Sequence, residues 1–275
     1  MSTGTPSGQQ PAAPIRFRRD AEQLTSGQLA SLRDGFSKLY EIPDDRGYEY
    51  FAGIHGLPLP IGCENAHGTP YFLPWHRAYL YFFERALRDR VPGTGLVWWN
   101  WETPLESASR LPGPYLKASE AGKANPLYSA KVSKLALEQG RRGGLVVGPK
   151  TRREPEGRTG LPSVEEVEDV LARRQFVDFS GALEQLHGRI HEWVGGHMSM
   201  IPFAAFDPVF WAHHTMCDRI WRLWQLRHPG QNPPAGILDE ALPPFRMTVR
   251  QTLSVTALGY DYAHSTAVAP VSARR

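Results

Sequence analysis

Residues 67–84 read HGTPYFLPWHRAYLYFFE, and the helix that they predict organises the rest of the chain. From Phe72 onward, an apolar and aromatic series continues to the basic ending RALRDR. Pro74 suits the first turn of a helix, where its missing N–H costs no hydrogen bond. We therefore predict a long, central helix over residues 72–90, with His76 near its start.

Four other segments carry helical spacing of apolar residues or helix-starting residues. They are TSGQLASLRDGFSKLYEI from Thr25, with Thr25 or Ser26 as cap, residues 47–55, residues 180–194, and VFWAHHTMCDRIWRLWQLRH after the cap pair Asp207-Pro208. Residues 245–255, FRMTVRQTLSV, are interpreted as short extended pieces. The sequence therefore predicts a mainly α domain with a helical bundle at its centre.

The length of 275 residues fits one domain, which we place at residues 15–264. Residues 1–14 consist of small and polar residues with little to bury, so we expect a disordered tail, and residues 265–275 form a second tail. Within the domain, residues 112–162 are rich in Gly, Pro and charge. This region is predicted to be a loop-rich, solvated excursion from the bundle.

The overall charge indicates no partner, because 31 basic side chains are nearly balanced by 28 acidic ones. No aromatic residue is interleaved with the arginines between Arg141 and Arg158, which argues against a nucleic-acid surface. No stretch reaches the roughly 20 apolar residues of a membrane span, and the N-terminus lacks the pattern of a signal peptide. Two cysteines are too few for a disulfide framework, so we expect a cytoplasmic protein.

Six of the ten histidines fall into two runs of three. In the second run, His187 and His191 lie four residues apart on a predicted helix, so they share one face and can hold one metal ion. The third partner comes from the next helix, which offers His213 and His214. Asp218 lies one turn beyond His214, where its carboxylate could orient a ligand or a neighbouring backbone group, which favours His214.

The first run draws one histidine from a helix end, one from a loop and one from a helix start: His55, His67 and His76. A set built this way is open on one side. Neutral imidazoles suit copper, zinc, iron and nickel, and a site without carboxylate ligands stays fully cationic. Three histidines and a water are also a catalytic zinc pattern, so a zinc hydrolase remains an alternative, although it leaves three histidines unused.

The segments HGTPYFLPWHRAYLYFFE (67–84) and DPVFWAHHTMCD (207–218), with LHGRIHEWVGGHM between them, resemble the copper signatures of the tyrosinase, catechol oxidase and hemocyanin family of type 3 copper proteins. The resemblance implies a four-helix bundle that holds two copper ions. It implies His55, His67 and His76 as ligands of one ion, and His187, His191 and His214 as ligands of the other.

The implied reaction uses O2 to oxidise o-diphenols or o-aminophenols to o-quinones, with weak ortho-hydroxylation of monophenols. The alternative is a hemocyanin-like protein that binds O2 without turnover. Hemocyanin units cover the copper mouth with an extra domain, for which we expect no residues here, because the core ends about thirteen residues before the C-terminus. Similar bacterial enzymes can need a small helper protein that loads the copper.

Further site residues follow from the resemblance. Glu184 is a candidate water holder or base, or else an exposed helix glutamate. Gly188 stands where strongly monophenol-active relatives often carry Asn, and Glu192 would face the mouth and attract amino-bearing phenols. The residues predicted to line the substrate pocket are Gly188, Glu192, His213 and Met216; those predicted to surround the ligands are Asp218, Phe72 and Phe210.

Two pairings stay open. Some relatives carry a thioether between a cysteine and the middle histidine of the first set, so Cys63 is either bonded to His67 or a plain buried thiol. An arginine near the N-terminus of similar proteins packs against a Tyr-x-Tyr element that closes the core. Here that element is Tyr260-Asp261-Tyr262, and the arginine is Arg16 or Arg18.

Overall fold

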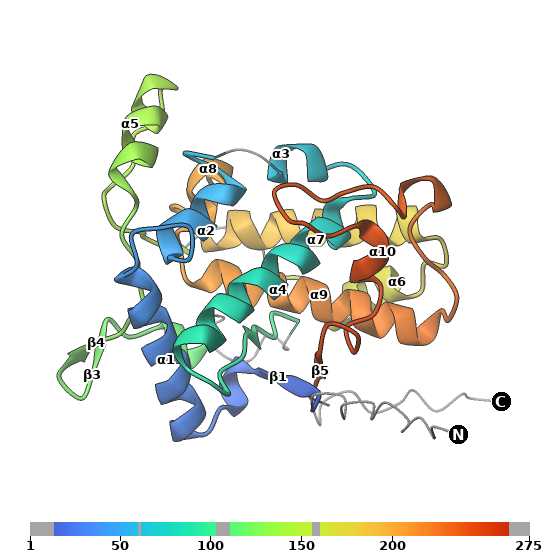
Figure 1. Ribbon diagram of the computed structural model, residues 1–275, viewed down its shortest axis with the longest axis horizontal. Coiled ribbons are helices and arrows are strands. Elements are labelled where there is room, and N and C mark those ends of the chain that lie inside the picture. The colour runs from blue at the N-terminus through green and yellow to red at the C-terminus, as the bar shows by residue number, and fades with distance from the viewer. Residues whose placement is uncertain (1–13, 60–61, 103–110, 156–159, 264–275) are drawn as a thin grey trace, which may run out of the picture.

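The computed structural model describes residues 14–59, 62–102, 111–155 and 160–263. Its centre is a bundle of long helices, α4 (Phe72–Arg90), α7 (Phe176–Val194) and α9 (Val209–Arg227), joined by the shorter α2 (Tyr48–His55). The other long helix, α1 (Ser26–Tyr40), packs on α4. The mainly α prediction and the predicted helix over residues 72–90 are both confirmed (Figure 1).

Local sequence explains where these helices begin. Thr25 caps α1 through a capping box with Gln28, as predicted. At α9 the carboxylate of Asp207 accepts a hydrogen bond from the backbone N of Val209, at 3.0 Å. Helix α7 begins at Phe176, four residues before the predicted start, because Phe176 and Phe179 extend its buried face by a further turn.

The remaining helical elements of the described residues are short. They are α3 (Cys63–Ala66), α5 (Lys134–Arg142), α6 (Val164–Leu171), α8 (Ile201–Ala204), α10 (Val249–Thr252) and three 3-10 turns, η1 (Ala21–Gln23), η2 (Gly113–Tyr115) and η3 (Ala235–Ile237). Helix α10 lies where we predicted extended pieces, so that prediction is wrong. The helix forms there because a capping box between Thr248 and Gln251 starts a helical turn in a segment of otherwise strand-like composition.

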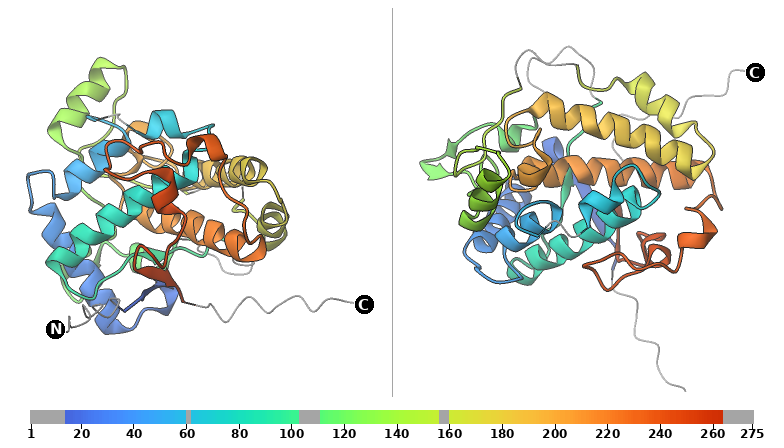
Figure 2. Two further views of the ribbon diagram at one scale, coloured as in Figure 1. Left: turned by 45° about the vertical axis from the view of Figure 1, so that its right-hand side comes forward. Right: turned by 90° about the horizontal axis from the view of Figure 1, so that it is seen from above.

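A small parallel sheet closes the bundle beside the ends of the domain. Strand β1 (Arg16–Asp20) pairs with β2 (Val97–Trp98) on one side and with β5 (Tyr260–Tyr262) on the other. A separate hairpin is formed by β3 (Ser119–Glu120) and β4 (Lys123–Ala124). The left view of Figure 2 shows β1 and β5 together below the bundle.

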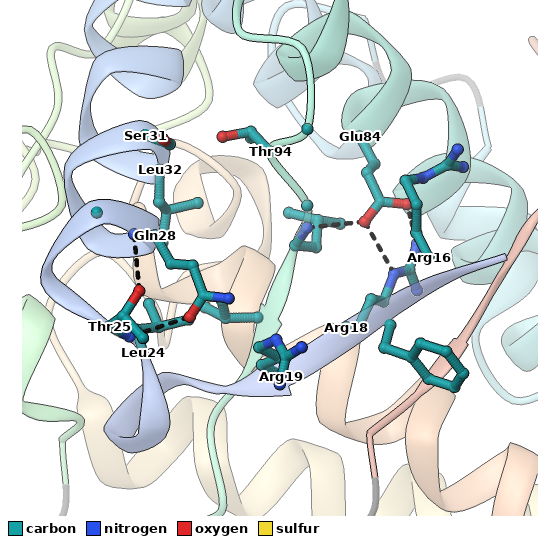
Figure 3. A pocket seen from close by; sticks show the side chains of 16 residues that line it. Arg16, Arg18, Arg19, Leu24, Thr25, Gln28, Ser31, Leu32, Glu84 and Thr94 are labelled. Carbon is teal, nitrogen blue, oxygen red and sulfur yellow. Dashed lines mark hydrogen bonds and ion pairs between the residues drawn. The ribbon is translucent and has the colours of Figure 1, made fainter. Parts of the chain in front are cut away.

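The arginine that closes the core is Arg18. Its side chain is 1% exposed, its guanidinium donates to Glu84 and to the hydroxyl of Tyr262, and it lies 3.7 Å from the centre of the Tyr260 ring. Figure 3 shows Arg18 turned toward Glu84 of α4. Because side chains alternate along a strand, burial of Arg18 puts its neighbour Phe17 on the exposed side of β1.

The excursion over residues 112–162 is only partly a solvated loop. Helix α5 projects from the body of the molecule, as Figure 1 shows. Beyond it, Thr151 is buried, and the side chain of Arg153 is 7% exposed and paired with Asp207. The prediction of an ordinary surface loop is therefore wrong for this part, because an arginine pairs with the cap of α9.

The tails predicted at residues 1–14 and 265–275 lie outside the described residues, except for Pro14. Among the helices that the structure describes, none combines the length and the apolar character that crossing a bilayer requires.

Candidate metal centre

The first set of histidines comes from three separate elements. His55 is the last residue of α2, His67 follows α3 directly, and His76 lies in the second turn of α4. Their ring nitrogens and the sulfur of Cys63 all lie within 4.8 Å of one another. His55 and His76 are buried, whereas the side chain of His67 is 24% exposed. The predicted open side of this set is the His67 side.

Different partners orient the rings of the first set. Nδ1 of His76 lies 2.7 Å from the carbonyl oxygen of Phe72, one turn earlier, and Nε2 has no partner among the described residues. Nδ1 of His67 lies 2.7 Å from Oε1 of Glu184, which comes from α7. A ring that donates through Nδ1 presents the lone pair of Nε2, the form that binds a metal.

Cys63 contacts the first histidine of the set. Its sulfur lies 3.0 Å from Nε2 of His55, and the side chain is fully buried. Burial raises the pKa of the Cys63 thiol, so the thiol form is favoured. The thioether to His67 stays a prediction.

The second set converges on one point. The Nε2 atoms of His187, His191 and His214 lie 2.9 to 3.3 Å from one another, and all three side chains are buried. The first two rings share a face of α7, and the third comes from α9. Nδ1 of His191 lies 2.7 Å from the carbonyl oxygen of Met198, which leaves its Nε2 directed at the shared point.

A ring nitrogen of His213 also lies within 4.8 Å of ring nitrogens of His187, His191 and His214, but His213 makes none of the contacts of 2.9 to 3.3 Å that join the other three. Its ring stacks on that of His187, with centroids 5.0 Å apart, and both of its nitrogens lack partners among the described residues. The geometry therefore favours His214 as the third ligand. His213 and Met216 are both fully buried, and their predicted place in the lining of the substrate pocket stays a prediction.

Asp218 does not orient a histidine, which corrects our prediction. Its carboxylate pairs with Arg18 and Arg77 and accepts from the hydroxyls of Tyr260 and Tyr262. Burial raises its pKa, but the two arginines outweigh this effect and hold the pKa below its usual value. The carboxylate of Asp218 therefore links β1 and β5 to α9.

The two sets face each other across a short gap. The rings of His76 and His214 stack with centroids 4.5 Å apart, and those of His67 and His187 are 5.4 Å apart. Two fully buried rings pack against the ligands as predicted: Phe72 lies 5.0 Å from His187, and Phe210 lies 4.1 Å from His214. Two neighbouring metal positions follow from this arrangement.

The electrostatics suit a metal centre. Burial, followed by the neighbouring imidazoles, holds the pKa of His55, His76, His187 and His214 well below the usual value. Burial lowers the pKa of His191 to about 4. These five rings are therefore neutral at neutral pH, and Nε2 of His76 has no hydrogen-bond partner among the described residues. Such donors fit copper or zinc.

Glu184 is held in place rather than exposed. Besides His67, it accepts a hydrogen bond from the backbone N of Gly68 at 2.9 Å. A cavity of about 370 Å³ lies beside it, between the turn at residues 68–70 and the first turns of α7. Gly188, one turn along, faces open space where a side chain would stand, and Glu192 is exposed on the next turn. These three residues, which we call the rim, follow one another about one turn apart along α7, and their place beside a substrate stays a prediction.

Sequence reasoning missed the groups that support the second set. They are the carbonyl of Met198, the buried His197 and the pair of Arg153 with Asp207. Main-chain carbonyls carry no sequence signal. The one available signal was a seventh histidine close to the second set, in the stretch WVGGHM.

The sequence matches the family model described as the common central domain of tyrosinase over residues 45–227, a span that contains both histidine sets. A tyrosinase of Streptomyces glaucescens is 33% identical over 253 residues, which cover 82% of this chain and 89% of that protein. A G-type hemocyanin of Enteroctopus dofleini is 32% identical over 263 residues, which cover 88% of this chain but 8% of that protein. The chain thus spans a small part of the hemocyanin and most of the tyrosinase.

Solved structures give the same likeness. A functional unit of octopus hemocyanin superposes with a TM-score of 0.74 at 27% identity, over 90% of this chain and 68% of that chain. A copper-bound active tyrosinase of Aspergillus oryzae, complexed with L-tyrosine, superposes with a TM-score of 0.75 over 93% of this chain and 94% of that chain. At 18% identity, the second likeness shows the fold alone.

Proposed function

The chain belongs to the tyrosinase family of type 3 copper proteins, and from that premise we propose that it binds two copper ions and uses O2 to oxidise o-diphenols to o-quinones, or o-aminophenols to o-quinone imines. His55, His67 and His76 would hold one ion, and His187, His191 and His214 the other. The observation that carries this proposal is the pair of facing histidine sets, in each of which the ligand atoms lie within 4.8 Å of one another.

The bound copper pair would supply O2 binding and a two-electron oxidation. In the complete reaction, two o-diphenols would reduce one O2 to two waters and leave as two o-quinones. Phe72 and Phe210 are fully buried against the ligand rings and exclude bulk water from the inner side of the site. His67, the most exposed ring of the six, marks the side from which a planar phenol would approach.

Monophenol hydroxylation would be weak, because the residues that could accept the phenolic proton are occupied or missing. Oε1 of Glu184 already lies within hydrogen-bond distance of Nδ1 of His67 and the backbone N of Gly68, so it is poorly placed to serve as a base. Gly188 has no side chain with which to hold a water molecule. An o-diphenol is more acidic in its first ionisation and needs less help from a base.

Glu192 would bias the choice among phenols. Its carboxylate is exposed on α7, directly after the ligand His191. A negative charge at the rim attracts amino-bearing phenols and repels phenols that carry carboxylates, by an amount that falls as salt rises. Turnover of o-aminophenol, catechol and a catechol carboxylate, each at low and high salt, tests this preference.

The central experiment is turnover by the copper-loaded protein. Incubation with catechol in air should produce the absorbance of o-quinone, and metal analysis should find about two coppers per chain. The likeness to octopus hemocyanin favours a second candidate, an O2-binding protein without turnover. Two bound coppers with no quinone would support that candidate. One zinc without copper would instead support a zinc hydrolase.

A copper-loading helper protein and a cytoplasmic location remain predictions. Activity of the protein after simple incubation with copper salts, compared with its activity after expression alone, measures the need for a helper. The proposed function involves no binding to nucleic acid or to a membrane.

A further inference from the structure

His197 is a buried histidine outside both sets, with 4% of its surface exposed. We propose that it is a positioning residue for the ligand His191, acting through the main chain of residues 195–198. This inference rests on the proposed copper site. His197 reaches the segment 148–154, which we expected to be an ordinary surface loop, so the proposal also assigns that segment a role.

The two hydrogen bonds of the His197 ring fix its form. The backbone N–H of Arg152 donates to Nδ1 at 3.1 Å, and Nε2 lies 3.2 Å from the carbonyl oxygen of Gly148. An N–H can only donate and a carbonyl can only accept, so the ring is neutral with its hydrogen on Nε2. One side chain therefore joins two peptide groups of the 148–154 segment.

The main chain adds to this attachment. The N of His197 donates to the carbonyl oxygen of Arg152 at 3.0 Å, and the N of Glu154 donates to the carbonyl oxygen of Val194 at 2.8 Å. Gly196 has a positive φ of 56°, and a Cβ there would lie 2.0 Å from the carbonyl oxygen of Arg152. Only glycine permits this approach, so the 148–154 segment and the loop after α7 are closely fitted.

The step from His197 to the metal ligand is one peptide long. The carbonyl of the next residue, Met198, accepts from Nδ1 of His191 at 2.7 Å and thereby presents Nε2 to the metal position. Met198 is fully buried. Release of His197 would let this carbonyl move or turn, and His191 would lose the contact that sets its tautomer and ring orientation.

The same segment also holds the start of the helix that carries His214. Arg153 donates to both carboxylate oxygens of Asp207, to Oδ1 at 2.6 and 2.9 Å and to Oδ2 at 3.0 Å. Oδ1 of Asp207 also accepts from the N of Val209. The 148–154 segment thus connects the loop after α7 with the beginning of α9. Both helices of the second set are supported by one segment, whereas this segment makes no described contact with the first set.

The test compares His197→Ala, His197→Gln and a matched control, His228→Ala. His228 is a half-buried histidine at the far end of α9, and its Nε2 donates to the carbonyl oxygen of Leu171 at 2.8 Å. The copper-loaded proteins are dialysed against a graded series of chelator concentrations, and copper per chain is measured. The thermal midpoint of each metal-free protein is measured in parallel.

For His197→Ala we expect about 10-fold weaker retention of one of the two coppers, the size typical of changes to groups that orient a ligand. Gln can accept and donate at its amide, so His197→Gln should restore retention. The control should keep both coppers. Should His197→Ala not fold, His197→Asn takes its place, because its side-chain oxygen keeps an acceptor near the Nδ1 position. We expect His197→Asn to retain less copper than both the wild type and His197→Gln.

Equal copper retention by His197→Ala and His228→Ala would overturn the proposal. So would loss of both coppers together with a lowered metal-free midpoint, since that result means a general structural role. A wild-type protein that binds no copper would refute the proposed function instead, so the two failures are distinguishable.

Discussion

The two histidine sets reach similar geometry by different routes. The second set is carried by two long helices, and its three Nε2 atoms lie within 3.3 Å of one another. The first set is carried by a helix end, a loop and a helix start, and one of its rings is held by a carboxylate from α7. The second set is therefore built mainly by secondary structure, and the first by tertiary contacts.

The two sets depend on different parts of the fold. His67 is oriented by Glu184, one turn before His187 on the same helix. Displacement of α7 would thus disturb both sets, whereas displacement of the turn at residues 67–70 would disturb only the first. Because the first set depends on both elements, we expect the copper that it would hold to be lost more easily than the copper of the second set.

The largest expected effect separates His214 from its neighbour. His214→Ala removes one of three converging nitrogens, so it should abolish binding of one copper and lower oxidase activity by more than about 100-fold, beyond the range for groups that only orient ligands. His213→Ala should keep both coppers. Metal content and quinone formation measure both variants, and the reverse pattern would show that the wrong histidine was chosen.

The next-largest effect is a loss of folding stability of the metal-free protein in acid. The His191 ring takes up a proton near pH 6.5 when unfolded, but only near pH 4 when folded. The unfolded state therefore binds more protons between these values, and stability is complete above pH 6.5 and falls as the pH drops toward 4. We expect a loss of about 3 kcal/mol from this ring.

Urea unfolding of the metal-free protein between pH 4 and 7 measures that loss. His191→Gln should flatten part of the curve, because the glutamine does not titrate. A curve unchanged by this substitution would show that the second set does not carry the acid sensitivity.

A smaller effect tests the carboxylate that orients the first set. Glu184→Gln weakens the contact with Nδ1 of His67, so we expect about 10-fold weaker binding of one copper. Gln185→Ala, at the adjacent exposed position, serves as the control. Chelator titration of each variant gives the result, and full retention of both coppers in Glu184→Gln would mean that His67 needs no such partner.

The smallest effect concerns the rim. Gly188 has open space around it, so Asn can be introduced without a clash. One added hydrogen bond to a water or a phenol is worth about 1 kcal/mol, which corresponds to roughly a fivefold rise in monophenol relative to diphenol turnover. The ratio of tyrosine to catechol oxidation measures it. An unchanged ratio would show that residue 188 does not limit hydroxylation.

Much of the helical frame could be predicted, because helix signals are local. Phe72–Arg90 was predicted to the residue from its apolar series. The start of α7 was missed, since Phe176 and Phe179 contribute to its face only through packing in the bundle. The turn at α10 was missed because strand-like composition concealed a capping pair.

The site residues show the same limit: local spacing related some of them, whereas packing decided the contacts of others. Spacing alone indicated that His187 and His191 share a metal, because residues four apart on a helix lie on one face. Asp218 shows the limit of this argument: the same spacing placed it near His214, yet its carboxylate turns to Arg18 and Arg77.

By itself, the sequence determined the two histidine sets, the long helices and the family signatures, all of which depend on short-range spacing. Only the tertiary structure decided that Arg18 closes the core, that Glu184 reaches His67 across 117 residues and that Met198 orients His191. The physical reason is that helical periodicity is set by neighbouring residues, whereas a hydrogen bond between distant groups exists only after packing has brought them together.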